Sequence, residues 1–190
     1  MGKVLKDAFL DELKDAYDGE KQLIRALPKL AQAATNPDLQ LAFQSHLGET
    51  RNHVALLEQV FELLGEKAKG KHCDGLAGII EEGKSILEED FEPATMDACL
   101  IAAGHRCEHY EIAAYGTLVA WGEGLGNQQV TKILSEILAE EKMADQKLSQ
   151  LAEGGIHSEA SSEQVADKSA RLAGSVAAAD AKESTSSMKA

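Results

Sequence analysis

The sequence predicts an all-α protein folded as a four-helix bundle. Two observations support this prediction: the composition and the spacing of the apolar residues. Hydrophobic residues make up 44% of the 190 residues, whereas aromatic residues make up 4% and Pro occurs 3 times, so strong helix formers dominate. Apolar residues recur every three or four positions over four long stretches, and only an α-helix turns this spacing into a continuous face. At roughly 100–200 residues per domain, the chain allows one compact domain.

The first two stretches predict a helical hairpin over residues 5–34 and 38–64. Pro28 lies inside the first stretch, and we expect it to kink the helix because the apolar stripe continues beyond it. The segment Thr35–Asp38 contains turn and capping residues with Pro at a first helical position, so it separates the two helices. Gly65 is expected to end the second helix.

The last two stretches predict a second hairpin, over residues 93–122 and from Asn127 to Gly154. The glycine-rich segment 65–92 carries only a shorter apolar pattern, so it predicts a long crossover that contains one short helix. Two hairpins joined by one long connection form the ferritin-like bundle topology.

The chain therefore divides into a helical bundle domain, residues 1–155, and a low-complexity tail, residues 156–190. The tail consists largely of Ser, Ala and scattered charges, with almost no large apolar residues. Such a segment buries too little surface to offset its ordering entropy, so we expect a disordered, mobile tail.

Charge and composition exclude several function classes. The chain has 32 acidic and 19 basic residues and a formal net charge of −13, the wrong sign for binding nucleic acid or an anionic membrane surface. Its apolar runs fall short of the roughly 20 residues of a membrane helix, and its first residues do not resemble a signal peptide, so we expect a cytoplasmic protein. Cys73, Cys99 and Cys107 form no C-x-x-C pair and are expected to be reduced thiols.

Acidic residues fall within the apolar stripe of each long helix. Glu20, for example, lies four residues after Ala16 and three before Leu23. A buried, unpartnered carboxylate costs several kcal/mol, and the stripes contain no Lys or Arg at these positions, so bound metal ions are expected to balance the charge. The candidate metal ligands are Glu20, Glu49, His53, Glu108, Glu111, Glu141 and Asp145.

Other polar residues near these positions receive different interpretations. His46 either binds metal itself or orients Glu49. Tyr17 and Tyr115 are expected to fill space and donate hydrogen bonds to the carboxylates. His105 and His109 fall toward the side of their helix and are interpreted as surface or interface residues.

The spacing of the ligands suggests that the two hairpins resemble each other. Glu49 lies 29 residues after Glu20, and Glu141 lies 30 residues after Glu111. His53 follows Glu49 by four residues, just as Asp145 follows Glu141, so each second helix offers two ligands on adjacent turns of one face.

These motifs resemble the YciE/YciF family of bacterial ferritin-like proteins. The similarity covers roughly residues 4–153 and rests on Tyr17–Glu20, His46–His53, Glu108–Gly116 and Glu140-Glu141 with Asp145. The resemblance implies a dimetal-binding four-helix bundle, association into homodimers and a link to bacterial stress responses. The sequence departs from the usual Glu-x-x-His pattern of ferritin-like proteins, because it has Glu-x-x-x-His on the second helix and Glu-x-x-x-Asp on the fourth.

The leading functional hypothesis is a non-haem dimetal protein with two iron ions, manganese or zinc being the alternatives. Glu49 and Glu141 would bridge the ions, while Glu20 and Glu111 would cap them. Such a pair supports a ferroxidase- or peroxidase-like oxidoreductase that acts on Fe(II), oxygen or peroxide. One alternative is a structural or interaction bundle whose metal only stabilises the core and the dimer. Another is a metal-free acidic adaptor, which predicts strongly raised carboxylate pKa values.

Overall fold

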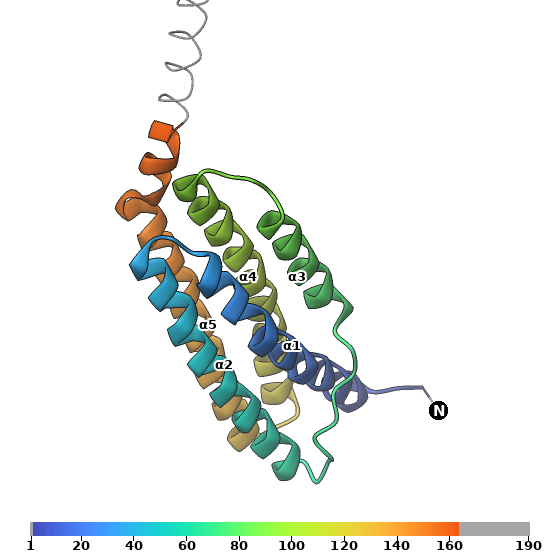
Figure 1. Ribbon diagram of the computed structural model, residues 1–190. Coiled ribbons are helices and arrows are strands. Elements are labelled where there is room, and N and C mark those ends of the chain that lie inside the picture. Colours follow the sequence, from blue (N-terminus) through green and yellow to red (C-terminus); the bar gives the residue numbers. More distant parts are fainter. Residues whose placement is uncertain (1, 164–190) are drawn as a thin grey trace, which may run out of the picture.

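The computed structural model describes residues 2–163, and these form the predicted bundle of helices (Figure 1). The elements are α1 (Leu5–Ala33), α2 (Pro37–Leu63), α3 (Asp74–Leu87), α4 (Pro93–Gly124), α5 (Gln128–Leu151) and a short π-helical turn, η1 (Ala152–Ile156). The hairpin α1–α2 packs on the hairpin α4–α5, and α3 lies outside the four-helix layer against α1 and α4. The all-α fold and the long crossover with one short helix are therefore confirmed.

Local capping explains where the long helices begin and end. The Asn36 side chain accepts hydrogen bonds from the backbone N–H groups of Asp38 (2.9 Å) and Leu39 (3.2 Å), so α2 starts where the sequence predicts. Gly65 and Gly126 have positive φ angles of 70° and 73° just after α2 and α4, a backbone conformation that favours glycine. Pro28 does not end α1, which continues to Ala33.

Each long helix buries one stripe of residues, spaced alternately four and three positions apart. This is the spacing of helices that pack nearly parallel in a bundle. We call these stripes the seams. The seam of the first hairpin contains Phe9, Leu13, Ala16, Glu20, Leu23, Leu27 and Leu30 on α1 and Leu39, Phe43, His46, Thr50, His53, Leu57 and Val60 on α2. The seam of the second hairpin contains Asp97, Ile101, Gly104, Glu108, Glu111, Tyr115, Leu118 and Gly122 on α4 and Val130, Leu134, Ile137, Glu141 and Leu148 on α5.

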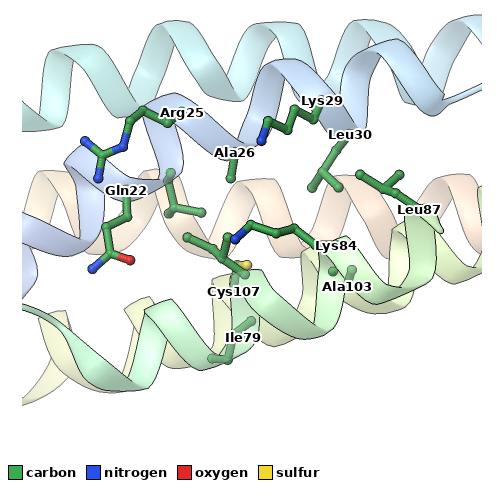
Figure 2. Close-up of a pocket in the computed structure, with 13 residues that line it drawn as sticks. Gln22, Arg25, Ala26, Lys29, Leu30, Ile79, Lys84, Leu87, Ala103 and Cys107 are labelled. Atoms are coloured by element: carbon green, nitrogen blue, oxygen red, sulfur yellow. The ribbon is translucent and has the colours of Figure 1, made fainter.

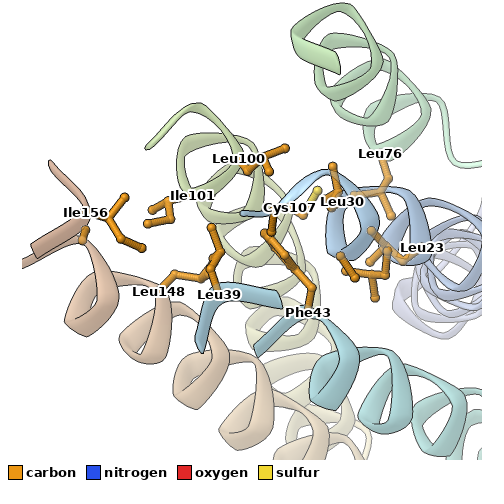
Figure 3. Close-up of a cluster of buried hydrophobic side chains, with 14 of the residues drawn as sticks. Leu23, Leu30, Leu39, Phe43, Leu76, Leu100, Ile101, Cys107, Leu148 and Ile156 are labelled. Atoms are coloured by element: carbon orange, nitrogen blue, oxygen red, sulfur yellow. The ribbon is translucent and has the colours of Figure 1, made fainter. Parts of the chain in front are cut away.

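The bundle has an apolar cluster on each side of a polar middle. The first cluster, which includes Leu39, Phe43, Ile101 and Leu148, fills the half where α1 ends and α2 begins (Figure 3). The second cluster includes Phe9, Leu57, Leu118 and Leu134 and fills the opposite half. Apart from Asp97, which accepts hydrogen bonds from Thr35 and Asn36 in the α1–α2 turn, the polar seam residues occupy the level between the two clusters. The packing therefore places several carboxyl and imidazole groups in the interior.

The expected tail differs from the structure at its beginning. Helical structure continues from η1 to Glu163, and Ile156 is buried in the first apolar cluster. The Glu163 carboxylate accepts hydrogen bonds from the backbone N–H groups of Ala94 and Thr95, both at 3.0 Å, and so caps α4. One apolar residue and one acid thus hold a segment that composition alone assigns to the tail. Residues 164–190 lie outside the described residues.

Over residues 2–163, none of the helices is both long enough and apolar enough to cross a membrane.

Candidate metal centre

Six ionisable side chains meet at the polar level of the seams, and each is at most 5% exposed. All four long helices contribute to this cluster, which we call the buried centre. Its members are Glu20 from α1, His46 and His53 from α2, Glu108 and Glu111 from α4, and Glu141 from α5. The seam spacing produces this meeting, because positions at the same level of four packed helices face one axis.

Glu20, His53 and Glu141 form one half of the buried centre. His53 Nδ1 lies 3.0 Å from Glu141 Oε1 and 3.4 Å from Glu20 Oε1. The other ring nitrogen of His53 lies 2.7 Å from Glu140 Oε2, at the edge of the bundle. The Tyr115 hydroxyl donates a hydrogen bond to Glu20 Oε1. The outer contacts of His53 and Glu20 therefore orient both groups toward the centre.

His46, Glu108, Glu111 and Glu141 form the other half. His46 Nε2 lies 3.3 Å from Glu108 Oε1 and 3.7 Å from Glu141 Oε2. Ligand atoms of these four residues all lie within 4.8 Å of one another, and the same holds for the first half. Glu141 belongs to both halves, with Oε1 facing His53 and Oε2 facing His46. This is the placement that a carboxylate shared by two ions requires.

Burial and mutual repulsion shift the pKa values of the buried centre. Burial raises the pKa of the Glu20, Glu108 and Glu111 carboxyl groups, and the charge of Glu141 raises each of these values further. Burial lowers the pKa of His53, but its close contacts with Glu141 and Glu20 outweigh this effect and raise the value to about 11. Four carboxyl groups face two imidazoles here, so full ionisation leaves an excess of negative charge even when both imidazoles are protonated.

Several polar atoms of the buried centre form no hydrogen bond of suitable geometry among the described residues, even where two of them, His53 Nδ1 and Glu141 Oε1, lie 3.0 Å apart. These atoms are Glu20 Oε2, His46 Nε2, His53 Nδ1, Glu108 Oε2, Glu111 Oε2 and both carboxylate oxygens of Glu141. Native proteins rarely leave so many buried polar atoms unpaired, because each costs about 1–3 kcal/mol. Carboxylate oxygens with a few imidazole nitrogens match the ligand preferences of iron, manganese and zinc. The residues present therefore fit bound metal ions.

The structure brings together Glu20, His53, Glu108, Glu111 and Glu141 from the predicted set, but it places Glu49 and Asp145 elsewhere. Glu49 is 40% exposed, and its Oε2 lies 3.3 Å from His46 Nδ1. Asp145 lies in a separate group, where Oδ1 is 2.6 Å from His105 Nδ1. Tyr115 contacts a carboxylate of the centre as expected, whereas the Tyr17 hydroxyl donates to Glu58.

His46 and a solvent groove are the main features that the sequence interpretation ranked too low or missed. Counting seam positions finds His46, because it lies three residues after Phe43 and four before Thr50. Between α2 and α5, a cavity of about 340 Å³ reaches the buried centre, with His46, Glu49, Glu108 and Glu140 among its lining residues. We call this cavity the α2–α5 groove. It connects one side of the centre to solvent.

A second hollow lies on the other side of the bundle, between α1, α3 and α4 (Figure 2). Its volume is about 290 Å³, and its charged lining residues are Arg25, Lys29 and Lys84. Cys107 also lines it, and burial together with the nearby charges of Glu108 and Glu141 raises the pKa of this thiol to about 12. Cys107 is therefore a neutral thiol, and the described lining of this hollow provides no acidic metal ligand.

Comparisons with known proteins agree with this architecture. A family model described as a domain of unknown function, DUF892, matches residues 4–161. Protein YciF of Escherichia coli strain K12 is 43% identical over 159 residues, which are 83% of this chain and 96% of that protein.

Three solved structures are also similar. The E. coli stress protein YciF has a TM-score of 0.79 at 43% identity, covering 82% of this chain and 99% of that one. YcfI from Rhodopseudomonas palustris has a TM-score of 0.76 at 41% identity, covering 77% and 94%. Protein XCC3681 from Xanthomonas campestris shares the fold, with a TM-score of 0.66 at 22% identity, covering 85% and 99%.

Proposed function

The chain belongs to the DUF892 family, and we propose that it is a non-haem dimetal carboxylate protein that holds two iron ions. One observation carries the proposal: the buried centre contains seven unpartnered polar atoms of carboxyl and imidazole groups, contributed by all four long helices. Metal ions satisfy such atoms and balance the excess negative charge at the same time. Manganese and zinc are the alternative metals.

The two halves of the buried centre define which residues would hold the ions. Glu20 and His53 would hold one ion, His46, Glu108 and Glu111 the other, and Glu141 would serve both. When bound, an iron pair supplies redox chemistry, such as the oxidation of Fe(II) by oxygen or peroxide. The protein orients the ligands through contacts around them, because Tyr115 holds Glu20, Glu49 holds His46 and Glu140 holds His53.

The α2–α5 groove supports exchange of ions and small oxidants with solvent. Its inner lining contains His46 and Glu108 of the buried centre, and its outer lining contains Leu41, Met143 and Lys147. Contact with His46 lowers the pKa of Glu49, so this half-exposed carboxylate stays ionised in the groove. A negative charge at this place attracts cations toward the centre.

The activity we propose is ferroxidase- or peroxidase-like, in the service of a bacterial stress response. The E. coli relative is described as a stress protein, and consumption of Fe(II) together with oxygen or peroxide limits oxidative damage. The competing proposal is a structural bundle, in which the metal only stabilises the core. The two proposals agree on metal binding and differ in turnover.

Anaerobic loading with Fe(II), followed by addition of oxygen or peroxide, tests the proposal on the full chain. We expect two iron ions per chain by elemental analysis, and oxidation of many Fe(II) equivalents per chain, followed by optical absorption. The double variant Glu20→Gln with Glu111→Gln removes one carboxylate from each half and should lose both properties. Glu123→Gln with Glu136→Gln, two exposed acids on α4 and α5, is the matched control. Bound metal without turnover would support the structural alternative, and absence of bound metal would refute both.

We also propose that the protein is a homodimer. This proposal comes from the resemblance of the motifs to the ferritin-like family. Size-exclusion chromatography with light scattering should give twice the chain mass, and a mass equal to one chain would contradict it.

A further inference from the structure

A second group of metal-ligating side chains lies outside the buried centre. It consists of His105 and His109 from α4 and Asp145 from α5, and we call it the surface triad. Asp145 Oδ1 lies 2.6 Å from His105 Nδ1 and 3.2 Å from His109 Nε2. The side chains of His105, His109 and Asp145 are 29%, 70% and 24% exposed. Two imidazoles from one helix thus converge on one carboxylate oxygen of the next helix, open to solvent.

The sequence of α4 separates the surface triad from the buried centre within a single turn. His105 and His109 are four residues apart and share one face of α4, the spacing of helical histidine pairs that bind zinc. Glu108 lies between them in sequence, but it points into the bundle, where its Oε1 lies 3.3 Å from His46. The order His-x-x-Glu-His is also the pattern of a class of zinc peptidases. Since Glu108 faces the buried centre here, the triad is suited to binding and not to hydrolysis.

The distances of the triad match the needs of a small divalent ion. Ligand atoms about 2.0–2.1 Å from a tetrahedral zinc ion lie roughly 3.3 Å from one another. His109 Nε2 and Asp145 Oδ1 are already 3.2 Å apart, and all three ligand atoms lie within 4.8 Å of one another. The shorter contact between His105 and Asp145 can lengthen by rotation of two side chains that are both partly exposed. Water can occupy the remaining coordination positions because the group faces solvent.

The charge and chemistry of the triad also favour such an ion. The whole chain carries a formal net charge of −13, and the triad itself contains a carboxylate, so a divalent cation is attracted to this surface. Two imidazoles and one carboxylate form a more nitrogen-rich ligand set than the buried centre, and this set suits zinc, copper, nickel or Fe(II). We propose that His105, His109 and Asp145 form a second metal site, exposed at the surface, for a divalent transition-metal ion of this class. The site does not depend on the dimetal function proposed above.

Zinc binding by variants of the full-length protein tests this site. His105→Gln with His109→Gln should bind one Zn²⁺ fewer per chain than the wild type, measured by equilibrium dialysis with elemental analysis. His72→Gln with His157→Gln removes two other exposed histidines and should bind as many ions as the wild type. With Cu²⁺ as the probe, the electron paramagnetic resonance difference spectrum between the two double variants should show coupling to two imidazole nitrogens. Circular dichroism melting reports whether each variant is folded.

Asp145→Asn provides the second test, because it keeps the shape of the side chain and removes its charge. We expect Zn²⁺ affinity at this site to fall at least tenfold. Equal Zn²⁺ stoichiometry and affinity in the triad variants and in the His72/His157 control would overturn the proposal. Failure of the buried centre to hold iron leaves the difference between these variants unchanged, so the two proposals fail independently.

Discussion

The two helical hairpins share a register but contribute different chemistry to the buried centre. Glu20 and Glu111 occupy matching seam positions, and thirty residues further along the chain the matching positions hold Thr50 and Glu141. The hairpin α1–α2 supplies both buried histidines and one acid, whereas α4–α5 supplies three acids. Neither set is balanced in charge without the other. Packing of the two hairpins therefore pairs excess carboxylate from one side with imidazole from the other.

The comparison also shows that Glu49 corresponds to Glu140, not to Glu141. Both lie 29 residues after the matching acids Glu20 and Glu111, one position before the seam. Their side chains are 40% and 34% exposed, and each contacts one of the two buried histidines. One residue rotates a side chain by about 100° around a helix, which moves it from the interior to the edge. The repeat therefore pairs Glu49 with Glu140. Both residues contact buried histidines from the edge of the bundle and do not reach the middle of the centre.

The largest difference between the hairpins is expected when the matching seam residues Glu141 and Thr50 are each substituted. Glu141→Gln removes the carboxylate that both halves share, so we expect metal affinity to fall more than 100-fold, with both ions lost on purification. Thr50→Val changes the matching position on α2, where the hydroxyl donates only to the His46 carbonyl, and should retain both ions. Elemental analysis of the two proteins measures the result. Retention of two ions by Glu141→Gln would contradict the assignment of a shared ligand.

Removal of metal should lower the stability of the fold, because the excess carboxylates of α4–α5 would then lack a balancing positive charge. A ligand at 100 times its dissociation constant stabilises the folded state by about 2.7 kcal/mol. We expect the wild type to show a stabilisation of this size on metal addition, measured by urea denaturation, because the metal balances the three acids of α4–α5. The Glu141→Gln protein serves as the comparison and should gain much less. Equal gains would mean that the metal binds outside the buried centre.

Substitution of Glu49 or Glu140, which lie at the edge of the bundle, should reduce metal affinity less, and by similar amounts. Glu49→Gln and Glu140→Gln each remove the partner that orients one buried histidine, and such partners contribute roughly 10–100-fold to metal affinity. We expect both variants to keep two ions per chain with affinity reduced within that range, measured by competition with a coloured chelator. An effect of Glu49→Gln as large as that of Glu141→Gln would restore Glu49 as a direct ligand.

The last prediction concerns the pH dependence of the stability of the metal-free protein. Burial lowers the pKa of each buried histidine, but the carboxylates around them outweigh this effect and raise the value of His46 to about 9 and that of His53 to about 11. A histidine with a raised pKa stabilises the fold below its unfolded value, near 6.5, and this stabilisation is lost as the pH rises toward the folded value. The raised carboxyl pKa values act in the same direction.

We therefore expect the free energy of unfolding of the metal-free protein to fall between pH 6.5 and 9, by up to about 1.4 kcal/mol per pH unit for each of the two histidines, measured by urea denaturation. Metal-bound protein should show a weaker slope, because its ligands are already deprotonated. A metal-free protein that becomes more stable between pH 6.5 and 9 would contradict the raised histidine values.

The pattern of apolar residues was enough to predict the four long helices, the crossover and five members of the buried centre. The structure places Glu49 and Asp145 outside the buried centre, because an apolar spacing of three or four leaves two neighbouring positions open. Strict alternation of four and three assigns Thr50 and Ala144 to the seams instead. On α2, no apolar residue anchors the phase of the seam between Phe43 and Leu57, since its members there are polar. The contacts of Ile156 and Glu163 depend on folding of distant segments, so composition could not reveal them.

The two apolar clusters have a consequence for how long an ion stays in the protein. They close the bundle above and below the polar level, and the α2–α5 groove opens on its flank. An ion that left through this groove would pass His46 and the side chains of Leu41 and Met143, which are exposed at its outer end. The residence time of a bound pair would then depend on displacing these few side chains as well as on affinity, so exchange would be slow even where equilibrium binding is moderate.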